Sequence, residues 1–190
     1  NLRQFGVPAI VAINHFTTDT DAEWKIVASF CREQGVPVAR CMHWAKGSAG
    51  IEELARKVVD LANSGKADFR PLYGDKLPLW DKVRCIAQQI YGAEDISADA
   101  SVKARFTQLQ ATYGHFPVCM AKTQYSLSAD ASLRGAPTGH FVPIRELRLS
   151  AGAEFVVAIA GDVMTMPGLP KVPSANSIRL DERGEVQGLF

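Results

Sequence analysis

Two common nucleotide-binding motifs are missing from this sequence of 190 residues. It has neither the Gly-x-x-x-x-Gly-Lys-Ser/Thr phosphate loop nor the Gly-x-Gly-x-x-Gly fingerprint, whose backbone amides hold a nucleotide's phosphates. Chemistry on nucleotide phosphates therefore needs residues from elsewhere. A Gly-x-Ser-x-Gly elbow is also missing, which disfavours a hydrolase triad assembled from Ser126, His140 and Asp162. We expect this chain to contain no catalytic residue of its own.

Metal, nucleic-acid and membrane signals are also missing. The four cysteines form no Cys-x-x-Cys pair and the four histidines are scattered, so we expect reduced thiols in a cytoplasmic protein and no metal site. The net charge is +1 and no block of Lys or Arg is present, which argues against nucleic acid as a partner. No stretch approaches about 18 consecutive apolar residues, and the start lacks a signal peptide, so we expect no membrane segment.

The hydrophobic content of 47% is enough for one substantial core. No convincing internal boundary interrupts the chain, which predicts a single α/β domain over residues 1–190. The chain starts at Asn1 without a methionine, which raises the alternative that it is a piece of something longer.

The first sixty-odd residues alternate between strand and helix patterns. We predict strands at Val7–Ile13 and Val36–Met42, each followed by a helix with apolar residues at helical spacing. The first helix runs from the capping residues Thr18–Glu23 to about Gln34, and the second carries the stripe Ile51–Ala62. This order predicts parallel strands with right-handed crossovers in a doubly wound sheet.

The rest of the chain is predicted as helices, short strands and loops. The loop Ala129–His140 and the proline-rich segment Met166–Pro173 are expected to be irregular and less protected from amide exchange than the strands. The fold class is therefore α/β, with a mostly parallel sheet, flanking helices and a long irregular C-terminal segment. The regular elements are two helices at Trp80–Ile90 and Ser101–Ala111, strands at Pro117–Lys122, Pro143–Ser150 and Phe155–Ala160, and a terminal hairpin at Ile178–Leu189 with its turn at Glu182–Gly184.

Aromatic residues follow both predicted N-terminal strands. Phe16 leaves the first strand and Trp44 leaves the second, and ligands of open α/β sheets bind at the carboxyl ends of the strands. If the strands are neighbours, the two rings are placed to flank one flat ligand. The alternative is that both rings only plug the end of the sheet. Asn14 offers an amide donor and acceptor to the edge of a heterocycle. The alternative is that its side chain hydrogen-bonds to the backbone of its own turn.

Lys46 and Gly47 precede the second helix in a glycine-rich stretch. They are candidates for binding an anion, although such a stretch is more often only a turn. His15 and His43 also lie near the expected crevice, where solvent-facing loop histidines are the alternative.

Several long runs resemble the carboxyl-terminal region of formate-tetrahydrofolate ligase, also called formyltetrahydrofolate synthetase. The resemblance covers essentially all 190 residues, with two departures: Thr17 replaces a common proline, and Ser48-Ala49 interrupts a usually glycine-richer stretch. The runs are Asn1-Leu2, Phe5–Pro8, Val11–Phe16, Thr18–Thr20, Trp44–Gly47, Phe69–Tyr73, Ile90–Ala93, Pro117–Ser128, Arg148–Ala153 and Gly161–Pro173.

This resemblance implies an activity for the complete enzyme. The family makes formyl phosphate from ATP and formate, and tetrahydrofolate then attacks it to give 10-formyltetrahydrofolate. Phe16 and Trp44 match the family's aromatic clamp for a flat ring, either adenine or pteridine. The resemblance also implies ATP with magnesium and tetrahydrofolate as ligands of the complete enzyme, an upstream region that carries the phosphate loop, and a homo-oligomer that is often a tetramer.

Two further hypotheses stay open from the sequence. The first hypothesis is that the chain is a stand-alone nucleotide- or folate-binding module without catalysis. The second is that it is a structural domain for subunit assembly. The coding sequence directly upstream, with or without a phosphate loop, separates the first from a ligase fragment, and ligand titration separates the second from both. The most useful single observation is the length of the intact gene product.

Overall fold

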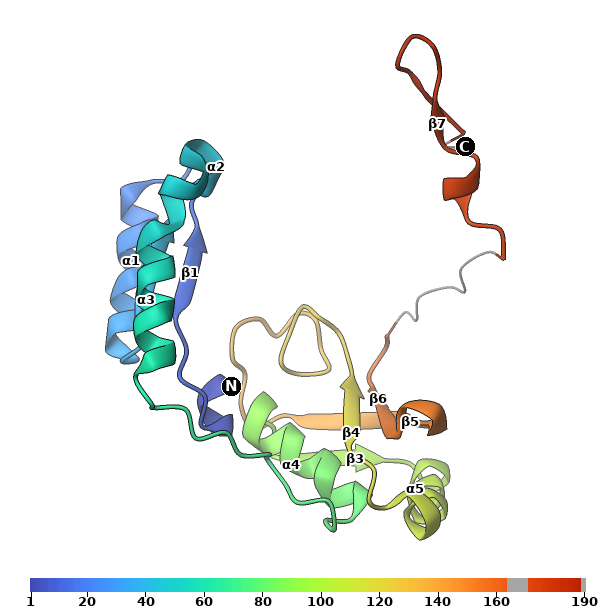
Figure 1. Cartoon of the computed structure of the whole chain (residues 1–190). Helices are drawn as coiled ribbons and strands as arrows, with labels where there is room; N and C mark the ends of the chain where they lie inside the picture. The colour runs from blue at the N-terminus through green and yellow to red at the C-terminus, as the bar shows by residue number, and fades with distance from the viewer. Residues whose placement is uncertain (164–170, 189–190) are drawn as a thin grey trace.

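The computed structural model describes residues 1–163 and 171–188, which form three parts with separate sheets (Figure 1). We call residues 1–65 the N-terminal unit and residues 79–163 the four-stranded unit. The third part is a C-terminal hairpin. Helices and predominantly parallel strand pairs confirm the predicted α/β class. The organisation of residues 1–190 as a single domain stays a prediction.

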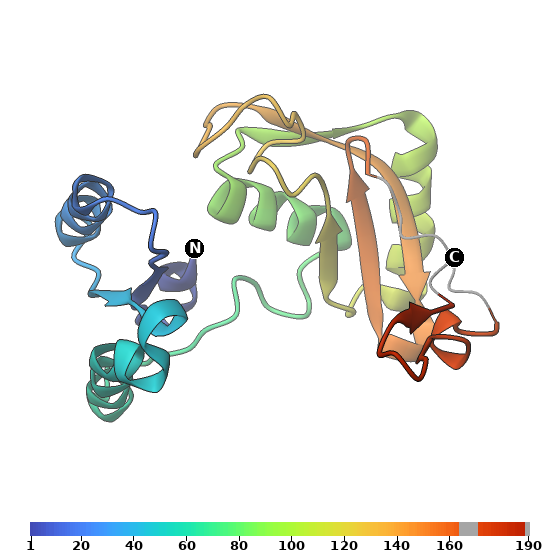
Figure 2. The ribbon, with the colours of Figure 1, turned by 90° about the horizontal axis from the view of Figure 1, so that it is seen from above.

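The N-terminal unit has the predicted doubly wound arrangement. Strands β1 and β2 pair in parallel, with Asn14 opposite Cys41 at their ends. Figure 2 shows α1 and α3 on opposite sides of this strand pair. The elements are η1 (Leu2–Phe5), β1 (Val11–Asn14), α1 (Asp21–Glu33), β2 (Val38–Cys41), α2 (His43–Lys46), η2 (Gly47–Ile51) and α3 (Glu52–Asn63).

Both strands are shorter than the apolar runs predicted. The run Val7–Ile13 forms a strand only from Val11, and the run Val36–Met42 only from Val38 to Cys41. Proline explains part of the difference, because it has no N–H to give to a ladder. Pro37 stands just before β2 and takes part only through its carbonyl, which accepts the Val11 N–H at 2.9 Å.

Helix α1 begins where the capping residues predict. The Thr20 side chain accepts the Glu23 N–H at 3.3 Å, and the Glu23 carboxylate accepts the Thr20 N–H at 2.7 Å. This reciprocal pair satisfies two amides that the helix itself leaves free. The hydrogen bonds that the Thr20 N–H and hydroxyl donate to the Glu23 carboxylate lower the pKa of this carboxyl.

A backbone tether joins the start of the N-terminal unit to the connection that follows the unit. The Asp68 N–H donates to the Gly6 carbonyl, and the Arg70 N–H donates to the Phe5 carbonyl, each at 3.0 Å. Gly6 has φ 68°, and a Cβ there would stand 1.9 Å from the Asp68 carbonyl oxygen. Only glycine therefore allows the two chain segments to approach this closely.

The four-stranded unit has the strand order β3-β5-β6-β4. The β3–β5 and β4–β6 pairs are parallel, and β5–β6 is antiparallel. Strand β3 was not predicted, because Ile96 is the only buried side chain in its four residues. The elements are α4 (Leu79–Tyr91), β3 (Asp95–Ala98), α5 (Ala100–Tyr113), β4 (Val118–Ala121), β5 (Phe141–Ser150), η3 (Ala151–Ala153) and β6 (Phe155–Ala160).

A bulge in β5 changes which side chains share a face. Strict alternation predicts Ile144 and Leu147 on opposite faces, yet both are buried. Between Ile144 and Glu146 the register with β6 shifts, because the partners Ala160 and Ile159 are adjacent. One residue of β5 is therefore unpaired, and the phase of the alternation changes after it.

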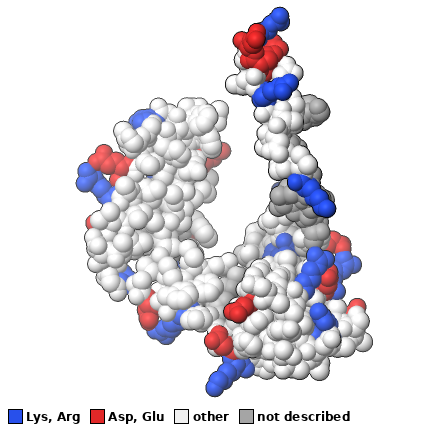
Figure 3. Space-filling model, turned by 45° about the vertical axis from the view of Figure 1, so that its right-hand side comes forward, with Lys and Arg blue, Asp and Glu red and all other residues white. Residues whose placement is uncertain are grey.

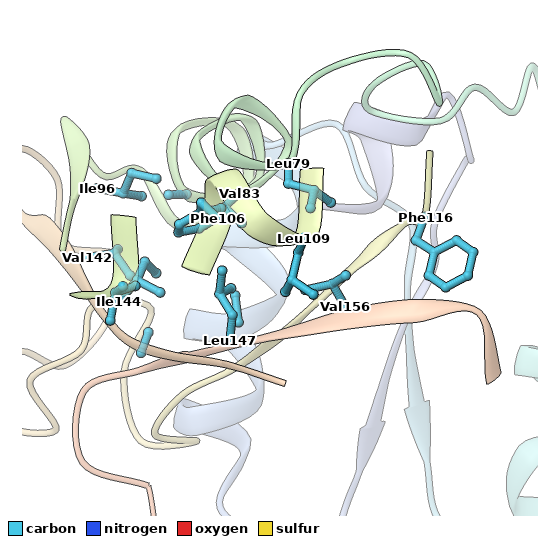
Figure 4. Packing of buried hydrophobic residues seen from close by; sticks show 14 of the residues in the cluster. Leu79, Val83, Ile96, Phe106, Leu109, Phe116, Val142, Ile144, Leu147 and Val156 are labelled. Carbon is cyan, nitrogen blue, oxygen red and sulfur yellow. The ribbon is translucent and has the colours of Figure 1, made fainter. Parts of the chain in front are cut away.

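The main core lies entirely in the four-stranded unit (Figure 4). Helices α4 and α5 contribute Leu79, Val83 and Phe106, which pack with Val142 and Val156 from the sheet. Lys82 is also fully buried, and its ammonium donates to the Gly114 and Phe116 carbonyls at 2.8 and 2.9 Å. Burial lowers the pKa of this ammonium, and the two carbonyls offset part of the cost.

The loop over residues 129–140 contains no helix or strand, as predicted, but it is anchored at its start. The buried Ser128 hydroxyl donates to the Asp130 carbonyl at 2.9 Å and accepts the Asp130 N–H at 3.0 Å. The Ser126 hydroxyl, also buried, lies 2.8 Å from it. The predicted early exchange of this loop stays a prediction.

The serine pair gives a first test of this anchoring. We expect Ser128→Ala to lower the free energy of unfolding by about 1–3 kcal/mol, because it leaves the Asp130 backbone groups without their partner. The control is Ser132→Ala, an exposed serine of the same loop, with an expected effect within about 0.5 kcal/mol. Urea unfolding of both variants measures the difference, and equal losses would contradict the anchoring role.

The C-terminal hairpin has the predicted turn. Strands β7 (Arg179–Leu180) and β8 (Val186–Gln187) are antiparallel, and the Asp181 carboxylate accepts two backbone N–H groups of the turn. The predicted last residue, Leu189, lies outside the described residues. Of the proline-rich segment Met166–Pro173, residues 166–170 also lie outside them.

Candidate functional site

Two chain segments with aromatic residues meet where β1 and β2 end. The His15 N–H donates to the Cys41 carbonyl at 2.9 Å, just beyond the last strand pair. The residues that follow each strand are therefore neighbours, as predicted. Trp44 lies on the short helix α2 rather than in the loop that the sequence predicted.

Phe16 and Trp44 are in ring contact. Their centroids are 5.8 Å apart with an angle of 56° between the ring planes. Phe16 is 49% exposed and Trp44 is 70% exposed. Rings that hold a flat ligand between them stand roughly 7 Å apart and nearly parallel, twice the contact distance of carbon atoms. A ligand would therefore have to turn one ring, and Trp44 is the freer of the two.

A tight turn fixes the backbone at Phe16. The Phe16 N–H donates to the Asp19 carboxylate at 2.8 Å, and the Asp19 N–H donates to the Phe16 carbonyl at 3.1 Å. Asp19 Oδ2 is also 3.6 Å from His15 Nδ1. The Asp19 side chain thus holds the point from which the Phe16 ring projects.

Arg40 connects the site to helix α1, a role that the sequence did not predict. Its guanidinium lies 2.6 Å from His15 Nε2 and 2.7 Å from the Asp21 carboxylate, and it lies over the Trp24 ring at 5.9 Å. Guanidinium only donates, so His15 Nε2 must accept and the histidine proton sits on Nδ1, facing Asp19. The Arg40 hydrogen bond and charge lower the pKa of the Asp21 carboxyl. The sequence did contain one sign of this role, because Arg40 is a charged residue inside the otherwise apolar strand β2.

Asn14 stands at the exposed end of β1. Among the described residues its side-chain amide has no hydrogen-bond partner, so it is free to meet a ligand. The predicted binding role of Asn14 therefore stays a prediction.

Lys46 is the last residue of α2, and Gly47 is the first residue of η2, which leads into α3. The Gly47 N–H donates to the His43 carbonyl, so this amide is already used. Helix α3 begins with Glu52 and Glu53, whose carboxylates occupy its first turn. An anion at this point would therefore depend on the exposed Lys46 ammonium.

The other candidate clusters do not assemble. The Ser126 hydroxyl contacts Ser128 and the Leu133 carbonyl, and Asp162 pairs with Arg145, while the His140 ring nitrogens are buried with no partner among the described residues. A hydrolase triad is therefore not formed. Within residues 1–163 and 171–188, no three His, Cys, Asp or Glu side chains are grouped to hold a metal ion.

An apolar cavity of about 420 Å³ lies beside the backbone tether. Phe5 and Phe69 line it, stacked with centroids 6.4 Å apart and ring planes 6° apart. Residues of α4 and β4, including Tyr91 and Met120, form another part of its lining. The sequence did not predict this cavity, because Phe5 and Phe69 are far apart in the chain.

None of the helices in the described part of the chain is long and apolar enough to span a membrane.

Comparison with known proteins shows the family. The formate-tetrahydrofolate ligase family model matches residues 1–190. Ligases of that name from Granulibacter bethesdensis and Mesorhizobium japonicum are 60% identical to the chain over 191 residues, and one from Sinorhizobium fredii is 58% identical. Each match covers 100% of this chain but only 33 or 34% of the relative. The chain thus spans about a third of its curated relatives, and it belongs to the formate-tetrahydrofolate ligase family.

Proposed function

We propose that the chain is the C-terminal ligand-binding portion of an ATP-dependent ligase that forms 10-formyltetrahydrofolate from formate and tetrahydrofolate. In this proposal Phe16 and Trp44 clamp a flat ring, either adenine or pteridine. The observation that carries it is the contact of two exposed rings, 5.8 Å apart, at the carboxyl end of two parallel strands. Stacking on such rings stabilises a bound ring by about 1–3 kcal/mol.

The neighbouring residues have supporting roles in this proposal. Asn14 offers its free amide to the edge of the ring, and Lys46 offers a positive charge to an anionic group of the same ligand. Asp19 and Arg40 position the turn below Phe16 through the contacts with His15. These side chains bind and orient a ligand, and none is assigned a bond-making step.

The phosphate chemistry is assigned to the rest of the enzyme. The described part of the chain groups no three His, Cys, Asp or Glu side chains around one point, and we assign the magnesium that accompanies ATP to the rest of the enzyme. The proposed partner is the upstream region of the same polypeptide, in a cytoplasmic homo-oligomer. Four free cysteines agree with a reducing compartment.

Ring removal tests the clamp in the intact gene product. We expect Phe16→Ala and Trp44→Ala each to weaken ring binding by about 1–3 kcal/mol, or roughly 5- to 150-fold in Kd. Titration calorimetry with an ATP analogue and with tetrahydrofolate measures this and shows which ring occupies the clamp. Unchanged affinity for both ligands in both variants would reject it.

The control is Arg32→Ala. Arg32 is an exposed polar residue in the last turn of α1, outside the apolar face of that helix. Its removal should leave both affinities unchanged. A loss as large as that of the ring variants would indicate a general effect on the N-terminal unit.

A further inference from the structure

The outer edge of β1 carries unpaired backbone groups. Alternate residues of a strand direct their N–H and C=O to opposite sides, and Val11 and His15 donate toward β2. Ala12 and Asn14 therefore direct their N–H groups away from β2. Within the described residues, β1 pairs with β2 alone and nothing accepts these two N–H groups.

A two-stranded parallel sheet is incomplete by itself. Parallel strands occur almost only in larger sheets whose faces are covered, and a two-stranded sheet is marginal in water. Here the only fully buried apolar side chains of the N-terminal unit are small, and they lie in α1 and β2: Ala28, Cys31, Ala39 and Cys41.

The helices of the unit leave large apolar side chains in water. On α1, Ile26 is 71% and Phe30 is 61% exposed. Helix α3 carries an apolar stripe but has no buried residue, and Val58 and Val59 are exposed on it. Figure 3 shows that most of the visible face of this unit is uncharged. An amphipathic helix normally buries its stripe, so these faces indicate missing neighbours.

We propose that a strand from the part of the same polypeptide outside these 190 residues pairs with the outer edge of β1 and runs parallel to it. The occupant follows from length, because the chain spans about a third of its relatives and most of the enzyme's residues are unaccounted for. This inference rests on the proposed function, in which an upstream region completes the enzyme.

The pairing would also complete the site. The carboxyl ends of parallel strands lie at one edge of a sheet, so the loop after the added strand would emerge beside Asn14 and Phe16. Groups absent from this chain, including a phosphate-binding loop, would thereby be brought next to the ring pair. The outer edge of β1 is thus an internal docking surface of the ligase.

Amide exchange in the intact gene product tests this without any substitution. If β1 is internal, the amides of Ala12 and Asn14 should be as protected as those of Val11 and His15, and at least about 100-fold slower than free edge amides. If β1 is an edge, protection should alternate, with Ala12 and Asn14 fast. Alternation would overturn the proposal. Protection that disappears on dilution would also overturn it, because the partner would then be a second copy of the chain.

This outcome is independent of the clamp. Protected amides with unchanged ring affinity in the Phe16 and Trp44 variants would keep the docking surface and reject the clamp. Alternating protection with weakened ring affinity would reject the docking surface and keep the clamp.

Discussion

Purified residues 1–190 are expected to form no 10-formyltetrahydrofolate from ATP, formate and tetrahydrofolate. The chain offers a ring pair but lacks the phosphate loop, and the one arginine at the site is engaged by Asp21 and His15. Phosphoryl transfer depends on positioning and on cations that neutralise the phosphates. A site without them should therefore show a complete loss of turnover rather than a reduced rate.

The measurement is product formation by the purified chain, with the intact gene product assayed in parallel as the positive control. Ring binding should be tested in the same preparation, because missing turnover is meaningful only for a chain that still binds its ligand. Turnover that depends on all three substrates, from a preparation free of intact enzyme, would contradict the proposal that the rest of the enzyme carries out the phosphate chemistry.

The second large effect is expected in the core of the four-stranded unit. Phe106→Ala should lower the free energy of unfolding by about 3–5 kcal/mol, the usual cost of emptying a buried aromatic site. Phe106 is 5% exposed, and Trp80 meets it edge-on at 5.1 Å between centroids. The substitution removes both the burial and this contact. Urea unfolding followed by circular dichroism measures the loss.

Phe141→Ala is the matched control for Phe106. It removes the same atoms from the same unit, but Phe141 is 52% exposed on β5. Its expected cost is below about 1 kcal/mol. A Phe106 variant that loses no more than this control would show that the core lies elsewhere.

The long elements could be predicted from the sequence because many residues support each of them. The helix predicted to end at Gln34 ends at Glu33, and the helix predicted over Trp80–Ile90 spans Leu79–Tyr91. The four-residue elements β3 and α2 could not be predicted because they lack an apolar run: Ile96 is the only buried residue of β3, and α2 has none. The β5 bulge could not be predicted, because an unpaired residue depends on the partner strand and not on the local pattern.

The site was predictable at the level of the backbone. Parallel strands end at the same edge of a sheet, so Phe16 and Trp44 had to lie close together once β1 and β2 paired. The 56° angle between the rings and the contact of Arg40 with His15 depend on rotamers and register. These could not be read from residue types.

The tether at Gly6 has a mechanical consequence for the ring pair. Phe5 and Gly6 are bonded there to Asp68 and Arg70, in the connection that leads from α3 to the four-stranded unit. These two hydrogen bonds keep the connection from moving independently of the segment that leads into β1. Helix α2, which carries Trp44, lies at the opposite end of the N-terminal unit from the N-terminus in Figure 1, so the tether fixes the base of the unit and leaves the exposed ring pair accessible to a ligand.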